Sequence, residues 1–349
     1  MKKCLFICNS YPIQPRILKV SSIVESLGIE CIYLVWDLES KATNQSQYYL
    51  FQRAYGYGHP IKKLFDSFGF IKYLKCVIEK EKIDYVYAFS FDSMYCCTML
   101  NKEIKVIYDI ADLPIINVPF VDFFLKYNEK RNVQRADAIL LASRFFQNYY
   151  KEYLEKCYII ENLPDFDMVP LQKKESDKLR VTFYGIIRYY EIMKNLIDAA
   201  ENSNVLIQIY GCGRDEDQLR AYTQKKGLNN VKFYGRYDKK DIPKIYSNSD
   251  LIWAVYPSKG LNERVAISNK YFESIYYATP CMFEQNTMVG KLAVENGSGM
   301  VVNCYSVQDI VQKLNEFEKK DFFFDCNELK SFSNYTKEFS MIFDRFENA

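Results

Sequence analysis

Histidine is almost absent from the sequence: only His59 occurs among 349 residues, in a loop sequence where a histidine is more often incidental than catalytic. None of the eleven cysteines forms the C-x2-C pair of a zinc site, and most lie inside apolar strand patterns, where a thiol behaves as a small hydrophobe. We therefore expect no bound metal and no cysteine nucleophile, in a chain that stays reduced in the cytoplasm.

The sequence also lacks an excess of one charge, because 46 Lys and Arg residues face 44 Asp and Glu residues for a net charge of +2. Nucleic-acid binders usually show a concentrated basic excess, so this balance does not support such a partner. Uninterrupted apolar runs of about 18 residues, which a membrane-spanning helix needs, do not occur. With 49% hydrophobic residues, the composition is that of an ordinary globular chain, and the length suggests two domains.

The first half alternates short apolar strands with helical segments, which is the pattern of a parallel α/β sheet. A helix is expected from about residue 15 to residue 27, because apolar side chains recur there at helical spacing and Gly28 follows. The expected strands are residues 4–8, 31–36, 85–89, 106–108, 138–141 and 158–160.

No G-x-G-x-x-G follows the first expected strand, so a nicotinamide or flavin dinucleotide is not expected in this half. The loop at residues 9–16 still lies at the carboxyl end of a strand, where α/β sheets bind ligands. Asp112 also follows a strand, so it is either a polar group at a cleft or a cap of the next segment.

Residues 48–82 mix aromatic residues with lysines, and from residue 61 the apolar side chains trace a helical stripe. A basic amphipathic helix of this kind either lies on a membrane surface or packs on the core with its lysines in water. The stripe comprises Ile61, Leu64, Phe65, Phe68, Ile71, Leu74 and Ile78.

The second half carries an ordered series of strand, turn and helix blocks. These blocks read Val-Thr-Phe-Tyr-Gly at 181–185, Ile-Gln-Ile-Tyr-Gly-Cys-Gly at 207–213, Val-Lys-Phe-Tyr-Gly-Arg at 231–236 and Ser-Asn-Lys-Tyr-Phe-Glu at 268–273. In this order and spacing the chain resembles the family 4 type of glycosyltransferase, which has two facing Rossmann-like domains, the GT-B architecture. A single glycine turn is weak evidence, so the resemblance depends on the ordered set.

The resemblance implies an α/β fold of two Rossmann-like domains. The expected parts are an acceptor domain at 1–163, a nucleotide-sugar donor domain at 164–325, and a C-terminal helical segment at 326–349 that crosses back to the first domain. A polar run at 173–178 marks the boundary by its change of composition. Residues 165–167 spell the D-x-D of metal-dependent glycosyltransferases, but they follow no strand and are discounted.

On the donor side, the resemblance implies a diphosphate cradle at Gly185 and Arg188, because Arg188 precedes a helix whose free N–H groups attract phosphate. Gly211 belongs to the next turn of the same site. The nucleobase is expected near Tyr237.

The helix that starts near Asn269 supplies the remaining donor contacts implied by the resemblance. Lys270 is expected beside the phosphates and Glu273 beside the ribose hydroxyls. These two residues are three positions apart and share a helical face, so a solvated surface ion pair is the alternative interpretation.

On the acceptor side, the resemblance points to Tyr11, Arg16 and Asp112. A solvated arginine at a helix start is the alternative for Arg16. Asp112, Arg188 and Lys270 are the expected catalytic groups.

Two positions depart from the family pattern. Glu191 stands where a lysine is usual, with Lys194 one turn later, and Val265 stands where the first glutamate of E-x7-E is usual, with Glu263 two residues earlier. These departures affect how the diphosphate and the donor sugar are held.

The sequence therefore predicts a cytoplasmic glycosyltransferase, retaining and independent of metal or cofactor. It would move a sugar from a nucleoside diphosphate to a hydroxyl of a glycan or lipid-linked glycan, with peripheral contact of its N-terminal domain to the inner face of the membrane as one open alternative. Two alternatives stay open. One is a nonenzymatic nucleotide-sugar-binding subunit, which the two departures motivate, and the other is a nucleotide-sugar 2-epimerase of the same architecture, which the scarcity of histidine disfavours.

Overall fold

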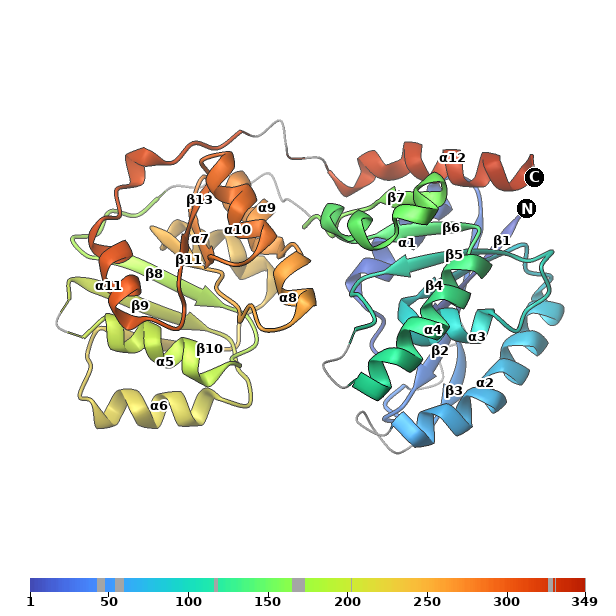
Figure 1. Cartoon of the computed structure of the whole chain (residues 1–349), viewed down its shortest axis with the longest axis horizontal. Helices are drawn as coiled ribbons and strands as arrows, with labels where there is room; N and C mark the ends of the chain where they lie inside the picture. Colours follow the sequence, from blue (N-terminus) through green and yellow to red (C-terminus); the bar gives the residue numbers. More distant parts are fainter. Residues whose placement is uncertain are drawn as a thin grey trace. The chain divides into compact units, whose positions relative to one another are not determined.

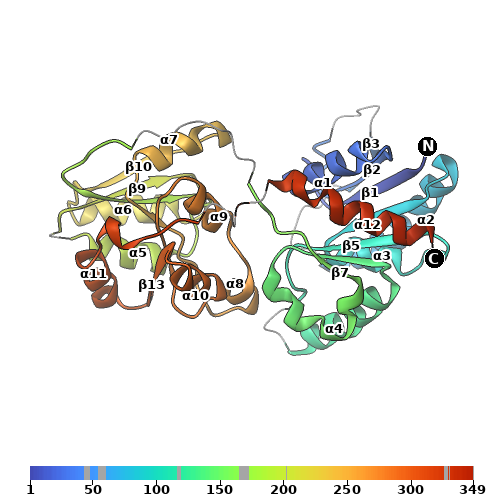
Figure 2. The same cartoon turned by 90° about the horizontal axis from the view of Figure 1, so that it is seen from above.

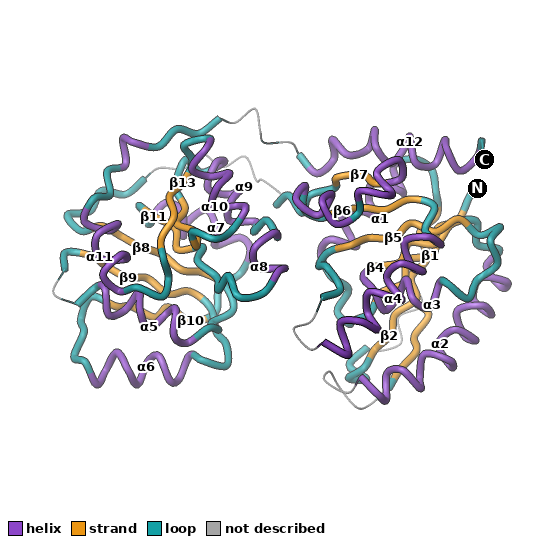
Figure 3. Tube along the Cα trace, viewed as in Figure 1, coloured by secondary structure: helices purple, strands orange, loops and turns teal. Residues whose placement is uncertain are grey.

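The computed structural model of the chain describes residues 1–42, 48–53, 60–115, 119–164, 173–201, 203–325, 329 and 331–348. The chain divides into two compact units, residues 1–162 with 332–349, and residues 163–331. Each unit holds a parallel β-sheet with helices packed against it (Figure 1, Figure 3). His59 and the D-x-D spelling at 165–167 lie outside the described residues.

The sheet of the first domain has the spatial order β3-β2-β1-β4-β5-β6-β7, with all neighbours parallel. β1 lies inside this sheet, where Leu5 is opposite Ile32 of β2 and Val86 of β4. Its residues 4–8 are all buried, as expected for a strand covered on both faces. The strands are β1 (Lys3–Cys8), β2 (Glu30–Asp37), β3 (Tyr48–Gln52), β4 (Tyr85–Phe89), β5 (Lys105–Ile110), β6 (Ala138–Leu141) and β7 (Cys157–Ile159).

The helices of the first domain begin where local sequence favours them. α1 starts at Pro15, whose ring presets a helical φ at the first position, and the chain leaves the helix through Gly28 at φ +78°. α3 contacts both α2 and α4, so these three helices form one layer. The helices are α1 (Pro15–Ser26), α2 (Pro60–Glu81), α3 (Ser90–Cys97) and α4 (Pro119–Arg135), followed by the 3-10 turns η1 (Arg144–Tyr149) and η2 (Lys151–Lys156).

The last helix of the chain, α12 (Thr336–Glu347), packs on the first domain beside α1 (Figure 2). Its Phe343 ring lies 5.0 Å from the ring of Tyr85 in β4. The 3-10 turn η6 (Phe332–Tyr335) leads into it, and the Tyr335 hydroxyl accepts a hydrogen bond of 3.1 Å from the backbone N–H of Glu161. The predicted return of the C-terminal helix to the first domain is confirmed.

The apolar stripe predicted for α2 is partly wrong. Leu74 is buried as expected, but Phe65 and Phe68 are 72% and 69% exposed. Phe70, which the stripe omitted, is fully buried and stacks on Trp36 of β2 at 4.5 Å between ring centroids. The helix therefore presents a different face to the core, because a bulky ring of β2 sets where α2 can pack.

Strand β3 was not predicted from the sequence. Its side chains are aromatic on both faces of the strand: Tyr48 packs edge-on against Tyr33, whereas Phe51 meets Phe70 of α2. An alternating apolar and polar pattern, which would have revealed a strand, is therefore missing.

The sheet of the second domain has the order β10-β9-β8-β11-β12-β13, again with parallel neighbours. Successive side chains of its central strand β8 point to opposite faces. Phe183 therefore joins the core cluster, whereas Tyr184 faces α7 and α9, where it contacts Tyr246 and Glu273. The strands are β8 (Leu179–Tyr184), β9 (Val205–Tyr210), β10 (Val231–Gly235), β11 (Leu251–Trp253), β12 (Cys281–Glu284) and β13 (Gly299–Val302).

The helices of the second domain cover its sheet. Buried side chains of α5, α6 and α11 belong to one apolar cluster with the strands. The helices are α5 (Tyr190–Ala199), α6 (Glu216–Lys225), α7 (Ile242–Ser247), α8 (Leu261–Val265), α9 (Asn269–Tyr276), α10 (Met288–Glu295) and α11 (Val307–Asn315), with the 3-10 turns η3 (Lys239–Asp241) and η4 (Lys319–Asp321).

The predicted α/β class with two Rossmann-like domains is confirmed by these two parallel sheets. None of the helices in the described part of the chain is long and apolar enough to cross a membrane.

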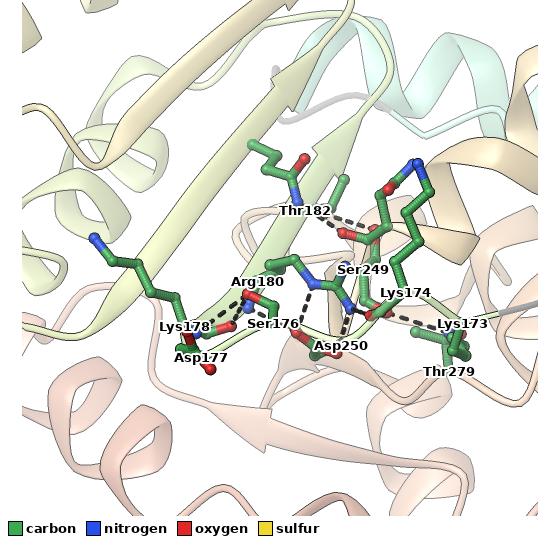
Figure 4. Close-up of polar contacts among 12 residues, drawn as sticks. Lys173, Lys174, Ser176, Asp177, Lys178, Arg180, Thr182, Ser249, Asp250 and Thr279 are labelled. Atoms are coloured by element: carbon green, nitrogen blue, oxygen red, sulfur yellow. Dashed lines mark hydrogen bonds and ion pairs between the residues drawn. The ribbon is translucent and has the colours of Figure 1, made fainter.

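A polar network at the amino edge of the second sheet anchors the polar run predicted as a boundary (Figure 4). Lys173 Nζ donates to the carbonyl oxygens of Tyr246 and Ser249, at 3.0 and 3.2 Å, and to the Thr279 hydroxyl. Beside it, the Arg180 guanidinium holds both carboxylate oxygens of Asp250 at 2.9 Å. Burial, together with the neighbouring cations of Lys319 and Arg180, lowers the pKa of Lys173 to about 7.

This lysine gives the stability of the second domain a pH dependence. Between pH 7 and the ordinary lysine pKa of 10.5, the unfolded chain binds a proton that the folded domain does not, so the free energy of unfolding rises with pH. The slope is at most about 1.4 kcal/mol per pH unit, and less with solvent screening. Urea unfolding at several pH values should show this slope in the wild type and not in Lys173→Met.

The exposed Lys178→Met is the matched control, since its charge lies in water. It should keep the wild-type pH dependence. Parallel stability curves for the wild type and Lys173→Met would contradict the assignment.

Candidate functional site

The switch in strand order of the second sheet lies between β8 and β11. The chain runs from β8 to β9 on one side, and β11 then pairs with the other side of β8. Loops that leave two such strands diverge, and α/β sheets bind ligands in the crevice between them. Gly185 follows β8 and Tyr256 follows β11, so both residues lie at this position.

Glycines let the loops after β8 and β9 lie against one another. A Cβ atom on Gly211, at φ +129°, would lie 1.8 Å from the carbonyl oxygen of Gly185, and one on Gly213 would lie 2.0 Å from the carbonyl oxygen of Ile187. Any side chain at these positions would push the two loops apart. In this structure Gly211 therefore shapes the edge of the site through backbone contact.

Arg188 is exposed in the loop between β8 and α5, with its guanidinium carbon 4.8 Å from the centroid of the Tyr189 ring. The amino end of α5 is not wholly open to an anion, because the Asp215 carboxylate accepts a 2.9 Å hydrogen bond from the Tyr190 N–H. Lys194 is bound elsewhere, by Asp198 at 2.9 Å. An anion at this loop would therefore depend on Arg188 more than on the helix end.

Lys270 is the buried cation of the site, with 7% of its surface exposed. Its ammonium donates a 2.9 Å hydrogen bond to the Tyr256 hydroxyl and lies 4.5 Å from the centroid of the Tyr184 ring. The nitrogen is also 3.7 Å from where a Cβ of Gly185 would stand. The structure thus brings the predicted residues Gly185 and Lys270 together.

The Lys270 ammonium has more N–H donors than protein acceptors. Of its three N–H groups, one bonds Tyr256, and its other contacts among the described residues are ring faces. Burial alone would lower the pKa of Lys270, but the Tyr256 hydroxyl and the Glu273 charge raise it above the ordinary value. A buried, protonated amine with unused donors is suited to an anionic ligand.

Glu273 is 5% exposed, so the interpretation of Lys270 and Glu273 as a solvated surface ion pair is wrong. Its carboxylate accepts hydrogen bonds from the hydroxyls of Tyr184 and, at 3.4 Å, of Tyr246. Burial raises the pKa of both tyrosines well above the ordinary value, so they remain neutral donors. The Tyr237 ring lies 5.9 Å from the Tyr184 ring, which brings the predicted nucleobase position next to the glutamate.

The remaining donor-side positions surround this group. Asn269 is the first residue of α9, after Ser268 caps that helix by accepting from the Lys270 N–H. Val265 is buried at 7% exposure, whereas Glu263 of α8 is partly exposed; burial and, to a smaller extent, the Glu263 charge raise the pKa of Tyr189. The short helix that lacks a carboxylate at 265 therefore carries one at 263.

Tyr256 is the site residue that the sequence did not indicate. The sequence shows that Tyr256 comes at the end of a strand. Its contact with Lys270, however, forms only because β11 lies beside β8. Strand order cannot be read from one sequence.

In the first domain, Arg16 is 4% exposed and is held by both carboxylate oxygens of Asp109, at 2.8 and 2.9 Å. The Tyr87 hydroxyl also donates to Asp109. The alternative of a solvated helix-start arginine is therefore wrong. This buried pair joins α1 to β5, and the role of Arg16 toward an acceptor stays a prediction.

The other two acceptor-side candidates lie in loops at the carboxyl ends of strands. Tyr11 is partly exposed after β1, and Asp112 is exposed after β5. Among the described residues, no group of three or more His, Cys, Asp or Glu side chains is arranged to hold a metal ion.

A family model matches most of the second domain. Residues 168–339 match the family model of glycosyl transferases group 1. D-rhamnosyltransferase WbpZ of Pseudomonas aeruginosa is 26% identical over 67% of this chain and 63% of its own length. The O-antigen chain mannosyltransferase C of Escherichia coli is 30% identical over 38% of this chain and 35% of its own length. The chain thus spans less than two thirds of each of these curated relatives.

The fold of the whole chain also has known counterparts. The apo form of the lipopolysaccharide outer core galactosyltransferase WaaB superposes with a TM-score of 0.67 at 14% identity, covering 100% of this chain and 98% of the other. The resemblance predicted from the ordered sequence blocks is confirmed.

The two buried charges of α9 predict different ligand effects. Lys270→Met should weaken UDP or GDP by about 10- to 100-fold and leave the nucleoside unchanged, because an ammonium bond to phosphate is worth about 1.5–3 kcal/mol. Glu273→Gln should weaken nucleoside and diphosphate alike, because its partner would be the ribose. Calorimetric titration with nucleoside, monophosphate and diphosphate separates the two patterns.

Lys194→Met is the control for removal of a lysine from this domain, since Lys194 pairs with Asp198. It should bind all three ligands as the wild type does. Near-native affinities in both α9 variants would remove residues 270 and 273 from the site.

Proposed function

We propose that the chain is a glycosyltransferase that moves a sugar from a nucleoside diphosphate to a hydroxyl group, because residues 168–339 match the model of glycosyl transferases group 1 and each domain holds a parallel sheet of Rossmann-like type. The acceptor in this proposal is a glycan or lipid-linked glycan. The names of the two curated relatives, a D-rhamnosyltransferase and an O-antigen chain mannosyltransferase, support transfer of a sugar during polysaccharide assembly.

The buried ammonium of Lys270 is the observation on which the proposal chiefly depends. As the sugar leaves, negative charge grows on the diphosphate, and a fixed cation with unused N–H donors stabilises that charge more in a protein interior than in water. Arg188 adds a second, exposed cation from the loop after β8. In this proposal these side chains balance the leaving-group charge without a metal ion.

The proposed reaction retains the anomeric configuration. The bond from the anomeric carbon to the diphosphate breaks, and the acceptor hydroxyl forms its bond on the same face while its proton passes to the departing diphosphate oxygen. Lys270 and Arg188 hold the leaving group, and the first domain contributes Arg16 and Asp112 toward the acceptor.

A nonenzymatic nucleotide-sugar-binding subunit remains the second candidate, because buried Val265 replaces a carboxylate near the expected donor sugar. Such a subunit would bind the donor and show no turnover. The partly exposed Glu263 favours an enzyme, since it restores a carboxylate to the same helix. A 2-epimerase is disfavoured, because this chain has a single histidine.

Binding and turnover test this proposal directly. The purified protein should bind UDP or GDP in a thermal-shift panel, since a ligand at 100 times its Kd stabilises a protein by about 2.7 kcal/mol. EDTA should leave this binding unchanged. Release of nucleoside diphosphate from a nucleotide sugar in the presence of a glycan acceptor would establish the enzyme.

Loss of nucleotide binding in EDTA would contradict the metal-independent mechanism. Donor binding without any hydrolysis or transfer across a panel of nucleotide sugars and acceptors would instead support the nonenzymatic subunit.

We also propose that the first domain contacts an anionic membrane surface through α2 and α4. Large apolar side chains on these two helices point to solvent beside basic residues. Three phenylalanines are largely exposed: Phe65 (72%) and Phe68 (69%) of α2, and Phe123 (72%) of α4. Because α3 contacts both helices, α2 and α4 belong to one layer of the domain. Aromatic side chains among lysines are suited to the headgroup region of a bilayer.

Vesicle flotation tests this contact. The wild type should float with phosphatidylglycerol vesicles and less with phosphatidylcholine vesicles, and the triple variant Phe65→Ser, Phe68→Ser, Phe123→Ser should lose most of this binding. Phe323→Ser is the control, because Phe323 is 67% exposed in the second domain. Equal flotation of the triple variant and the control would contradict the proposal.

A further inference from the structure

We propose that Tyr256 is a phosphate-binding residue of this site: its hydroxyl accepts a hydrogen bond from Lys270 and donates one to an oxygen of the bound diphosphate. The inference rests on the proposed function and adds to it a residue type that the expected donor contacts do not include. It concerns the class of anion bound, a nucleoside diphosphate, and not the sugar.

Tyr256 occupies the place in the sheet where a ligand is expected. It follows β11, the strand that lies beside β8 at the switch in strand order, and Gly185 follows β8 itself. Because Gly185 has no side chain, the Lys270 ammonium comes within 3.7 Å of its Cβ position. The hydroxyl of Tyr256, 2.9 Å from that ammonium, therefore stands at the same crevice.

The hydrogen bonds of the Tyr256 hydroxyl leave room for a stronger acceptor. Lys270 donates to the Tyr256 oxygen, and the Ser268 side chain also forms a hydrogen bond with this hydroxyl. A phenol has one hydrogen to donate, and the ammonium cannot accept it, so the neutral Ser268 hydroxyl is the acceptor that these two partners offer. A phosphate oxygen beside Lys270 is charged and would therefore accept this hydrogen more strongly than the serine does.

Tyr256 also connects the two cations of the site. The Tyr256 ring meets the Tyr189 ring edge-on, with 6.3 Å between the ring centroids. The Arg188 guanidinium carbon lies 4.8 Å from the centroid of the same Tyr189 ring. Arg188 comes from the loop after β8 and Lys270 from α9, and an anion that contacts both would lie beside the Tyr256 hydroxyl that holds Lys270. A phenylalanine at 256 would keep this ring contact and remove the hydroxyl alone.

Charges around the hydroxyl make it a stronger donor. Burial alone would raise the pKa of Tyr256, but the charge and hydrogen bond of Lys270, with Ser268 and Arg188, lower it below the ordinary value. Other titratable groups also face this part of the site. They are Glu273 of α9, Tyr237 after β10, Tyr184 of β8, Tyr189 in the loop before α5, and Glu263 of α8. A more acidic phenol gives a shorter and stronger hydrogen bond to a phosphate oxygen.

Tyr256→Phe tests the assignment by calorimetry at neutral pH. The variant should bind UDP or GDP, and inorganic pyrophosphate, about 10- to 100-fold more weakly, while the nucleoside binds as in the wild type. Tyr234→Phe is the matched control, because Tyr234 is 51% exposed on the edge strand β10 and stacks on Tyr210. It should bind every ligand normally.

The pH dependence distinguishes a hydrogen-bond donor from a residue that only supports the fold. Above the pKa of Tyr256, the phenolate has no hydrogen to donate and repels phosphate, so wild-type diphosphate affinity should fall as pH rises toward 10. In Tyr256→Phe this fall should be absent up to the titration of Lys270. Circular dichroism and the thermal midpoint of the variant should match the wild type.

Each outcome decides one question. If the wild type binds no nucleoside diphosphate, the proposed function and this assignment both fail. If it binds, and Tyr256→Phe has the same affinity and the same pH profile, the proposed function stands and the assignment of Tyr256 is overturned. Equal losses for nucleoside and diphosphate would also overturn it, since they would indicate a general disturbance of the domain.

Discussion

The parallel pairing of β8 with both β9 and β11 is the constraint on which the whole candidate donor site depends. It carries Gly185 and Tyr256 to the same edge of the sheet from segments about seventy residues apart, at the place where the loops diverge. The close approach of Gly211 to the Gly185 carbonyl then fixes one wall of that edge, and α9 brings Lys270 against it. Without this pairing, Gly185, Tyr256 and Lys270 would not lie next to one another.

The two buried cations, Arg16 and Lys270, differ in the groups that hold them. Arg16 in the first domain has a charged partner, because both oxygens of the Asp109 carboxylate bind its Nε and Nη2, and its Nη1 is buried without a hydrogen-bond partner. Lys270 in the second domain is held by a neutral hydroxyl and by ring faces, while the carboxylate of Glu273 is bound by tyrosine hydroxyls. A buried charge with a neutral partner retains affinity for an anion, whereas one with a bidentate carboxylate does not.

Tyrosine gives the candidate donor site its particular chemistry. Tyr184 and Tyr246 donate to Glu273, and Tyr256 accepts from Lys270, so each buried charge is bound by phenols. Phenols bury a large apolar ring and keep one polar group, so they hold charged groups in an interior at little cost in packing. This arrangement accompanies the departures at Glu191 and Val265, where charged contacts usual in the resembled family are replaced.

The sequence by itself determined the α/β class, most strand positions in both domains, the returning C-terminal helix and the candidate residues Gly185, Lys270 and Glu273. Strand and helix periods and glycine turns are local properties, so one chain displays them. Tertiary structure alone decided that Phe70 and not Phe65 faces the core, that residues 48–52 form a strand, and that Tyr256 meets Lys270. These depend on which strands become neighbours, and strand order is set by long-range packing that no local pattern encodes.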